Sequence, residues 1–332
     1  MRLTIAIPTL NRDYCVERAV DSALSQTSPA IEVIVSNNGS ADRTREVLSK
    51  YSDPRLRVFH HDSTMPITDH GNFLLDRAQG DLFVGLSDDD YLEPEFAERV
   101  LDLYAKRADI SFAYTRCWTH IRNEAYASPG GPEFEDTLSF FEHYFAGRRH
   151  IFWCACVTRT SDLRRLGGLP SGVLIGDMYF WTQLAFEGPI GCVSEPLAHY
   201  TYLVDNASVG IPVCKWATET RLLIERVSAR LKPLEAGPGT IRQLERLMSR
   251  YLARTTANQF ALNASQGASK LVLAQALGSC GSLLAGDLVT SIPRVFAALF
   301  LPTRLVRALV TRFASSRSRW VRAGDGAVDA RS

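Results

Sequence analysis

The first 95 residues alternate short apolar runs with segments whose apolar residues recur at helical spacing. Each apolar run is bounded by polar or turn-forming residues, which is typical of buried strands. The predicted strands are Leu3–Ile7, Ile31–Val35, Leu56–Phe59 and Leu82–Leu86. The predicted helices are Tyr14–Gln26, a helix capped by Ser40 or Asp42 that runs through Lys50, and His70–Gln79. This alternation predicts an α/β fold with a mostly parallel central sheet flanked by helices.

Polar residues of this segment gather in the loops that follow the strands. Pro8 is expected to end the first strand because it fixes φ and has no N–H, and Thr9 follows it. Asn38 follows the second strand, and Asp88 follows the fourth. Ligands of open α/β sheets bind outside the carboxyl ends of the strands. We therefore expect these loops to form one binding site.

Three adjacent acids, Asp88–Asp90, follow the fourth predicted strand. Neighbouring carboxylates repel one another, and a half-buried cluster is costly without a cation or hydrogen-bond donors. Mg²⁺ or Mn²⁺ supplies that compensation through one or two carboxylates, while phosphate and water complete its shell. The pattern indicates metal-assisted handling of a diphosphate. The alternative is a solvated acidic turn before a helix that begins near Glu93, with Pro94 in its first turn.

The pattern beyond residue 95 predicts further helices over Phe96–Arg107 and Glu133–Ala146, and strands over Ile110–Tyr114 and Ile151–Thr158. The aromatic residues of 133–146 recur at helical spacing, which favours packing in the core over stacking on sugars. Cys154 and Cys156 would point to one face of the last strand, but no further ligands at a matching spacing favour a metal site there.

Residues 211–322 are predicted to form a separate helical region, with helices over Arg221–Lys232, Thr240–Thr256 and Ala268–Leu288. Within it, Thr303–Arg322 holds six arginines and no acid, interleaved with apolar residues. That pattern fits a basic amphipathic helix that lies on anionic lipid. It fits equally a helix packed on the rest of the chain with a solvated basic face. Residues 323–332 are expected to be a disordered tail.

Composition narrows the class of protein. A net charge of +1 gives no global reason to expect nucleic acid as a partner. The seven cysteines are scattered without C-x-x-C pairs, which favours a reduced, cytoplasmic setting. No signal peptide is predicted, and no apolar run reaches the roughly 18 residues that span a bilayer. We expect a soluble or peripheral protein, at most at the inner face of the cytoplasmic membrane.

Five short motifs occur in order: Ile5–Arg12, Ser25–Thr27, Ile34–Ser40, Ala78–Asp81 and the acidic run that ends at Pro94. In this order and spacing the chain resembles the family 2 glycosyltransferases, which have the GT-A fold, a Rossmann-like α/β sheet. The resemblance covers residues 1–205. It implies a catalytic domain over residues 1–210, divided into a nucleotide-binding half, 1–95, and an acceptor-binding half, 96–210.

The resemblance also implies roles for individual residues. In that family the first loop and the loop after the second strand hold the nucleoside, and a DxD-type motif binds the donor diphosphate through a metal. Counting back from Pro94 places the second acid of that motif on Asp89, so Asp89, with Asp88, is expected to bind Mn²⁺ or Mg²⁺. Asp90 and Trp181 are expected to face the acceptor or to be structural. Donor-nucleotide binding is assigned to Pro8, Thr9, Asn11, Arg12, Asn38, Asn72 and Asp88.

The donor base stays open. Asn37 and Asn38 stand where the family often has two acids, and asparagine offers both a donor and an acceptor. A UDP-, dTDP- or GDP-linked sugar is therefore compatible with the sequence.

Asp177 is the candidate catalytic base. In family members a comparable Gly-rich segment precedes Glu-Asp, and here Gly176 replaces the Glu while Asp177 remains. An inverting transfer needs one carboxylate to take the proton of the acceptor. The metal-bound diphosphate leaves without a protein acid, because the cation absorbs the developing charge. The alternative for Asp177 is an N-cap of the helix Met178–Phe186.

His199 lies where relatives often carry an arginine and a histidine beside the diphosphate, and a structural role is expected for it. The other six histidines form no i, i+4 pair and no zinc pattern, so no role is predicted for them.

These features imply an inverting, metal-dependent glycosyltransferase that acts on a glycan or lipid-linked glycan, in cell-surface polysaccharide synthesis. Two alternatives stay open. A non-catalytic sugar-nucleotide or glycan binding protein of the same fold is compatible with Gly176 and with the pair Asn37-Asn38. A sugar-phosphate nucleotidyltransferase is disfavoured, because its first loop would be Gly-rich, whereas Pro8–Arg12 has no glycine.

Overall fold

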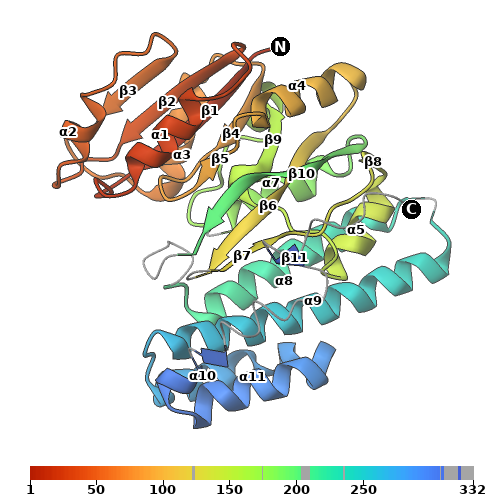
Figure 1. The fold of residues 1–332 in the computed structure, drawn as a ribbon. Coiled ribbons are helices and arrows are strands. Elements are labelled where there is room, and N and C mark those ends of the chain that lie inside the picture. The colour runs from red at the N-terminus through yellow and green to blue at the C-terminus, as the bar shows by residue number, and fades with distance from the viewer. Residues whose placement is uncertain are drawn as a thin grey trace. The chain divides into compact units, whose positions relative to one another are not determined.

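The computed structural model describes residues 1–121, 124–173, 175–202, 210–234, 236–306, 308–309 and 321–322 (Figure 1). The chain forms two compact units. The described residues of the first unit belong to 1–137, 150–202 and 321–322, and those of the second belong to 138–149 and 210–309.

The first unit is built on a sheet whose N-terminal part is parallel. Its strands are β1 (Leu3–Thr9), β2 (Ile31–Asn37), β3 (Leu56–His60) and β4 (Leu82–Gly85), in the order β4-β1-β2-β3. The helices between them are α1 (Val16–Leu24), α2 (Thr44–Leu48) and α3 (Ile67–Arg77), coloured red to orange in Figure 1. The predicted alternation of parallel strands and helices is confirmed.

Beyond β4 the sheet continues with mixed pairing. β9 (Cys156–Arg159) runs antiparallel to β4 and to β6 (Phe112–Ile121), and β6 pairs in parallel with β10 (Ile190–Thr201). Four short strands join the sheet: β5 (Tyr91–Leu92), β7 (Glu124–Ala127), β8 (Phe134–Glu135) and β11 (Val321–Arg322). The remaining helices of the unit are α4 (Phe96–Lys106), α6 (Thr160–Arg165) and α7 (Gly176–Leu184).

Helices cover both faces of the parallel strands because alternate residues of each strand point to opposite faces. One face packs residues such as Ile5, Val33 and Val84 against apolar residues of α1 and α4. The other face packs Ala6, Ile34 and Phe83 against α3, α6 and α7. With both faces buried, the polar loops at the carboxyl ends of β1, β2 and β4 form the edge at which a ligand can bind.

The end predicted for the first strand differs from the structure, and the start of the helix after the acidic run is now fixed. β1 does not stop at Pro8 but runs to Thr9, and Pro8 pairs in register with Ser36. β4 pairs with β1 only as far as Ala6, so the proline lies beyond the stretch in which both edges of β1 are paired. The helix predicted over Phe96–Arg107 is α4, which begins at Phe96 as predicted; the alternative start near Glu93 is wrong, because the chain after the acidic run forms β5.

Two further predicted elements have mixed structure. Residues 133–146 begin with β8, and the helix α5 (Thr137–Phe145) starts only afterwards. Residues 151–158 begin with a 3-10 turn, Trp153–Ala155, so Cys154 and Cys156 do not share one face of a strand. The turn places the Trp153 indole against Gly85, where an added Cβ would lie 1.9 Å from the ring.

The second unit is helical, as predicted. It contains α5, α8 (Val213–Leu231), α9 (Pro238–Ser265), α10 (Lys270–Cys280) and α11 (Leu288–Phe300), around a core that includes Ala257, Phe260, Leu273, Val295 and Ala298. The helix predicted over 268–288 is interrupted, because residues from Gly281 to Asp287 form a 3-10 segment. Among the described residues, no helix has the length and apolar content needed to cross a membrane.

The basic helix predicted over Thr303–Arg322 is described only in part. Residues 303–306 and 308–309 are helical, whereas Val321–Arg322 forms strand β11, which pairs with β7. The predicted helix therefore does not reach Arg322. Residues 310–320 and the predicted tail, 323–332, lie outside the described residues.

A buried glutamate of β2 forms hydrogen bonds with residues at the amino-terminal ends of β1 and β3 and with the turn before β4. Glu32 of β2 accepts hydrogen bonds from Thr4 Oγ1 (2.5 Å), Gly80 N (2.9 Å) and Gln79 N, and its other oxygen accepts from Arg57 Nη2 (3.1 Å). Burial raises the pKa of Glu32, but these donors and the Arg57 charge outweigh burial and hold the pKa below its ordinary value of 4.5.

We expect Glu32→Gln to lower the free energy of unfolding by about 2 kcal/mol at pH 7, since the donors lose a charged acceptor. Because the folded-state pKa is lowered, this contribution is complete above the ordinary value of 4.5 and is lost as the pH falls through the folded-state pKa. Urea unfolding of both proteins at pH 7 and in steps below pH 4.5 measures the difference, which should shrink in acid. The exposed Glu46→Gln is the control, and an equal loss there would contradict the expectation.

Candidate active site

The first loop and the loop after β2 are joined by hydrogen bonds at the carboxyl edge of the sheet. Asn11 Oδ1 accepts from Ala41 N, and Asn11 N donates to Ser40 Oγ, each at 2.8 Å. Arg12 N donates to Thr44 Oγ1 at 3.1 Å. Asn11 has a φ of 54°, in the left-handed region that asparagine tolerates better than most residues. The two loops predicted to hold a nucleoside are thus adjacent and mutually braced.

Asn38 is used to hold a third loop. Its Nδ2 donates to Met65 O (3.0 Å), and its Oδ1 accepts from Met65 N (2.9 Å). Gly39 follows with a φ of +74°, and a Cβ there would lie 2.9 Å from the carbonyl carbon of Ser63. The predicted contact of Asn38 with the donor stays a prediction. Its amide already braces the segment that leads into α3.

The three acids at the end of β4 are all buried, with exposed fractions of 9% for Asp88, 5% for Asp89 and 2% for Asp90. Asp88 Oδ1 lies 3.9 Å from Arg12 Nε. Burial, with the charge of Asp89, raises the pKa of Asp88 to about 6, although Thr9, Arg12 and the Leu10 N–H oppose the rise. The solvated-turn alternative is excluded by this burial.

Asp90 accepts a hydrogen bond from a strand of the sheet. Its Oδ1 accepts from Thr201 N at 2.8 Å, next to the end of β10. Burial, followed by the charge of Asp89, raises the pKa of Asp90 well above its ordinary value. Of the two roles expected for Asp90, this contact favours the structural one.

Arg18 holds the backbone of the acidic run, a role that sequence reasoning missed. Its Nη2 donates to Asp89 O (2.6 Å) and to Thr201 Oγ1 (3.1 Å), and its guanidinium lies 4.5 Å from the ring centroid of Tyr91. Tyr91 in turn stacks on His199, with centroids 4.0 Å apart. The only sequence signal was the position of Arg18 on the exposed face of α1.

Two histidines from different strands extend this cluster. His199 Nε2 lies 2.7 Å from Glu93 Oε1, and His199 Nδ1 lies 2.8 Å from His120 Nε2. Burial lowers the pKa of both histidines, so they are neutral at pH 7. A neutral His199 that donates to Glu93 must accept at Nδ1, so His120 is the donor between them. His199 thus has the structural role expected of it, and it shares that role with His120.

Asp177 is the second residue of α7, and its cavity also touches the end of β4, the strand that leads into the acidic run. It lines a small cavity of about 10 Å³ with Gly85, Trp153, Cys156 and Trp181 among others. Burial raises the pKa of Asp177, and the backbone N–H of Met178 opposes the rise. The residue before the helix is Ile175, so Asp177 is not its N-cap. Trp181 is 2% exposed, which favours its structural alternative.

Asn72 positions the loop that leads to Asp177. Its Nδ2 donates to Leu169 O (2.9 Å), and its Oδ1 accepts from Leu169 N (2.6 Å). Gly168 has a φ of +72°, and an added Cβ would lie 2.4 Å from Asn72 Oδ1. Among the described contacts none joins the side chain of Asp177 to the acidic run, but Gly85, three residues before Asp88, lines the same cavity as Asp177.

Asp88 and Asp89 fit a divalent cation by their charge. Two adjacent buried carboxylates, one with a raised pKa, gain from a cation that offsets their repulsion. In the part of the chain that the structure describes, no group of three or more His, Cys, Asp or Glu side chains is arranged to hold a metal. Two carboxylates suffice for Mg²⁺ where a diphosphate and water complete its shell.

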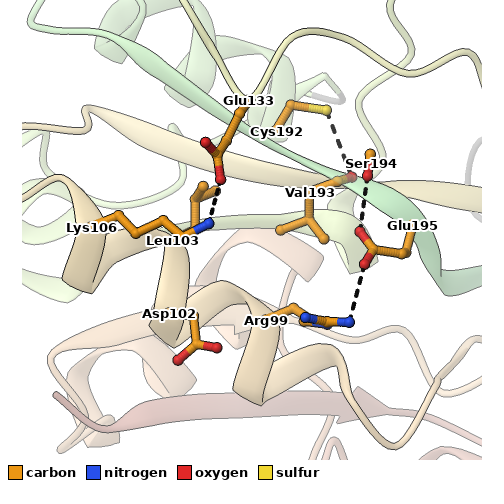
Figure 2. A pocket seen from close by; sticks show the side chains of 9 residues that line it. All are labelled: Arg99, Asp102, Leu103, Lys106, Glu133, Cys192, Val193, Ser194 and Glu195. Carbon is orange, nitrogen blue, oxygen red and sulfur yellow. Dashed lines mark hydrogen bonds and ion pairs between the residues drawn. The ribbon is translucent and has the colours of Figure 1, made fainter. Parts of the chain in front are cut away.

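A larger cavity of about 420 Å³ lies between α4 and the first half of β10 (Figure 2). Figure 2 shows two ion pairs on its walls, Arg99–Glu195 at 3.3 Å and Lys106–Glu133 at 2.6 Å. None of the predicted site residues lines it. It lies at the start of β10, whereas the acidic run meets the end of that strand.

Comparison with known proteins identifies the segment that carries the acidic run. Residues 4–154 match the family described as Glycosyl transferase family 2. This segment belongs to that family. The family 2 segment resembles, at 36% identity over 115 residues, the chondroitin synthase of Pasteurella multocida (strain Pm70). That match covers 34% of this chain and only 12% of the synthase.

A second relative is matched over more of its length. An uncharacterized glycosyltransferase of Haemophilus influenzae is 25% identical over 210 residues, which cover 62% of this chain and 70% of the relative. The similarity to a glycosyltransferase therefore extends over most of the length of this relative.

Solved structures of GT-A glycosyltransferases share the fold. Staphylococcus aureus TarS (1–349) in complex with UDP-GlcNAc has a TM-score of 0.63 at 14% identity, covering 96% of this chain and 92% of TarS. The mannosyltransferase PcManGT of Pyrobaculum calidifontis, in complex with GDP-Man and Mn²⁺, has a TM-score of 0.55 at 17% identity, covering 96% and 88%. The predicted GT-A fold with a C-terminal helical extension is confirmed.

We expect Arg18→Met to loosen the acidic run, because it removes both hydrogen bonds of the guanidinium while keeping an apolar stem over Tyr91. Losing about 1.4 kcal/mol of local stability corresponds to a roughly tenfold faster amide exchange in the peptide that contains Asp89. Hydrogen–deuterium exchange measures this, with peptides of β2 as the internal reference.

Arg99→Met is the matched control, since Arg99 is an exposed arginine on the wall of the larger cavity. Unchanged exchange around Asp89 in Arg18→Met would contradict the positioning role of Arg18. Partial protection in Arg18→Lys would support it.

Proposed function

We propose that the protein is an inverting, metal-dependent glycosyltransferase that uses a nucleotide-diphosphate sugar as donor. The observation that supports it most is the buried pair Asp88 and Asp89 at the carboxyl edge of a family 2 segment, beside Arg12. The two neighbouring structures are complexes with UDP-GlcNAc and with GDP-Man, so a UDP- or GDP-linked sugar is the first donor to test, with dTDP-linked sugars next.

The acceptor is proposed to be a glycan or a lipid-linked glycan, in cell-surface polysaccharide synthesis. Relatives named as chondroitin and hyaluronan synthases support a polysaccharide product, and the chain covers only 12% of each of them. A cytoplasmic location at the inner face of the membrane would give the enzyme access to both a soluble donor and a lipid-linked acceptor.

The proposed roles follow from the chemistry of the transfer. Asp88 and Asp89 would hold Mn²⁺ or Mg²⁺, which neutralises the charge that develops on the departing diphosphate. Arg12 adds a second positive charge next to Asp88. Thr9, Asn11 and the backbone after Pro8 form the loop on which the nucleoside would lie.

Asp177 is proposed as the base. Its carboxylate would take the proton of the acceptor hydroxyl while the acceptor oxygen bonds to the anomeric carbon and the bond from that carbon to the diphosphate breaks. A raised pKa strengthens a carboxylate as a base, provided that it stays ionised at the working pH. Asp177 is partly exposed but lines a cavity of only about 10 Å³, so the proposal requires that cavity to widen when substrates bind.

We expect slow, metal-dependent release of nucleoside diphosphate from one donor in a panel of UDP-, GDP- and dTDP-sugars. Asp89→Ala should abolish release, and Asp177→Asn should lower transfer to an acceptor at least about 100-fold, since it removes the proton acceptor. Release is measured with Mn²⁺, Mg²⁺ or EDTA. Asp102→Asn, an exposed acid of α4 on the wall of the larger cavity, is the control and should keep full activity.

The alternative is a binding protein of the same fold, which the absence of a second acid before Asp177 favours. Donor binding by calorimetry without any release or transfer would support that alternative. If the protein neither binds a donor nor releases nucleoside diphosphate with either metal, both the enzyme and the binding-protein hypotheses are refuted. Activity that survives in EDTA would refute only the metal dependence of the transfer.

A further inference from the structure

Among the residues of α11 whose side chains the structure describes, every exposed position is apolar. Its exposed positions are Leu288, Ile292, Pro293, Phe296 and Phe300, and the exposed fractions of Ile292, Phe296 and Phe300 are 58%, 55% and 67%. A surface helix of a globular protein normally turns polar residues to water. Here the spacing of four residues from Leu288 to Phe300 forms one continuous stripe of roughly 18 Å.

The opposite face of the same helix anchors it in the second unit. Ser291, Val295, Ala297 and Ala298 are buried, and Val295 and Ala298 belong to the core with Phe260 of α9. The stripe is therefore presented by a helix whose other side is packed. Phe296 and Phe300 also contact each other, with ring centroids 4.7 Å apart.

The first turn of α10 adds to this surface. Lys270 Nζ donates to the carbonyl oxygens of Ala298 and Leu301, the latter at 2.9 Å, so the start of α10 lies beside the end of α11. The next two residues, Leu271 and Val272, are 69% and 55% exposed. Exposed apolar groups thus come from two helices at one end of the unit.

Charge is segregated into the same part of the sequence. Residues 268–322 contain eight basic residues and one acid, Asp287, a net charge of +7 in a chain whose total is +1. Such a segment attracts an anionic surface. It also disfavours contact between two copies of the chain through this face, because two segments of charge +7 would meet.

We propose that the α11 face, formed by Leu288, Ile292, Phe296 and Phe300 with Leu271 and Val272, binds the surface of an anionic lipid bilayer. The apolar side chains enter the region between headgroups and acyl chains, and the exposed Arg304, which follows α11, contacts the anionic headgroups. This surface differs from the basic helix expected from sequence, since its apolar part precedes residue 303. The proposal does not depend on the sugar-transfer activity.

The test is co-sedimentation of the full-length protein with vesicles of phosphatidylcholine, alone or mixed with phosphatidylglycerol. We expect binding to the mixed vesicles that weakens at high salt, as charge screening requires. Ile292→Ser, Phe296→Ser and Phe300→Ser combined should weaken binding by more than about 100-fold, because burying each side chain is worth at least about tenfold. Phe296→Ser alone is compared with Leu222→Ser, a leucine of α8 that is 46% exposed in the same unit and should bind as wild type does.

Four outcomes would overturn the proposal. They are absence of binding by the wild type, equal binding to both kinds of vesicle, unchanged binding by the triple variant, and a dimer in sedimentation equilibrium that the triple variant dissociates. A fall in the unfolding temperature of the triple variant would also overturn it, because polar residues at positions that face water leave stability unchanged and a fall would place the face against the chain itself. No substrate is present, so failure here is separable from failure of the proposed catalytic function.

Discussion

Three consecutive buried carboxylates impose the main constraint on the first unit. Each needs donors or opposite charge, and no single loop supplies enough of them. Asp88 has Arg12 and the first loop, Asp89 is held through its carbonyl by Arg18 of α1, and Asp90 accepts from Thr201 at the end of β10. The acidic run therefore couples β1, β4 and β10, and the parallel order of the sheet brings those elements to one edge.

The need to satisfy buried polar groups also explains why asparagines occur around that edge of the sheet. Asn11, Asn38 and Asn72 each use their side-chain amide on the backbone of another loop, at Ala41, Met65 and Leu169 respectively. An amide can replace a missing strand partner because it carries a donor and an acceptor. These hydrogen bonds brace the loops without a ligand, so a donor would be recognised by the backbone groups and side chains that the contacts leave available.

The parallel half of the sheet was predictable because its signal is local. Continuous apolar runs at β1, β2 and β4 and helical spacing at α1 each follow from a few neighbouring residues. The 3-10 turn at Trp153 was not, because it depends on Gly85 offering room for an indole from a segment far along the chain. β8 was likewise predicted to be part of a helix, because its pairing with β10 cannot be inferred from the neighbouring residues.

The site was predictable in its residue types more than in its contacts. The run Asp88–Asp90 stood out by composition, whereas Arg18, Tyr91 and His120 are brought together only by strands and helices distant in sequence. Burial also distinguished roles that the sequence could not. Asp90 and Trp181 are nearly inaccessible, which favours their structural role, whereas Asn11 lies at the surface, where a donor could reach it.

The division of the chain between the two units has a consequence for synthesis. Helix α5 lies in the middle of the sequence, yet Tyr144 bonds to Tyr251 and the carbonyl of Phe145 accepts from Arg254, both on α9. A ribosome releases α5 about a hundred residues before its partner helix, so its aromatic face stays uncovered during that interval. Removing α8 to α11 would make that exposure permanent, and the shortened chain would carry an uncovered, aggregation-prone aromatic helix.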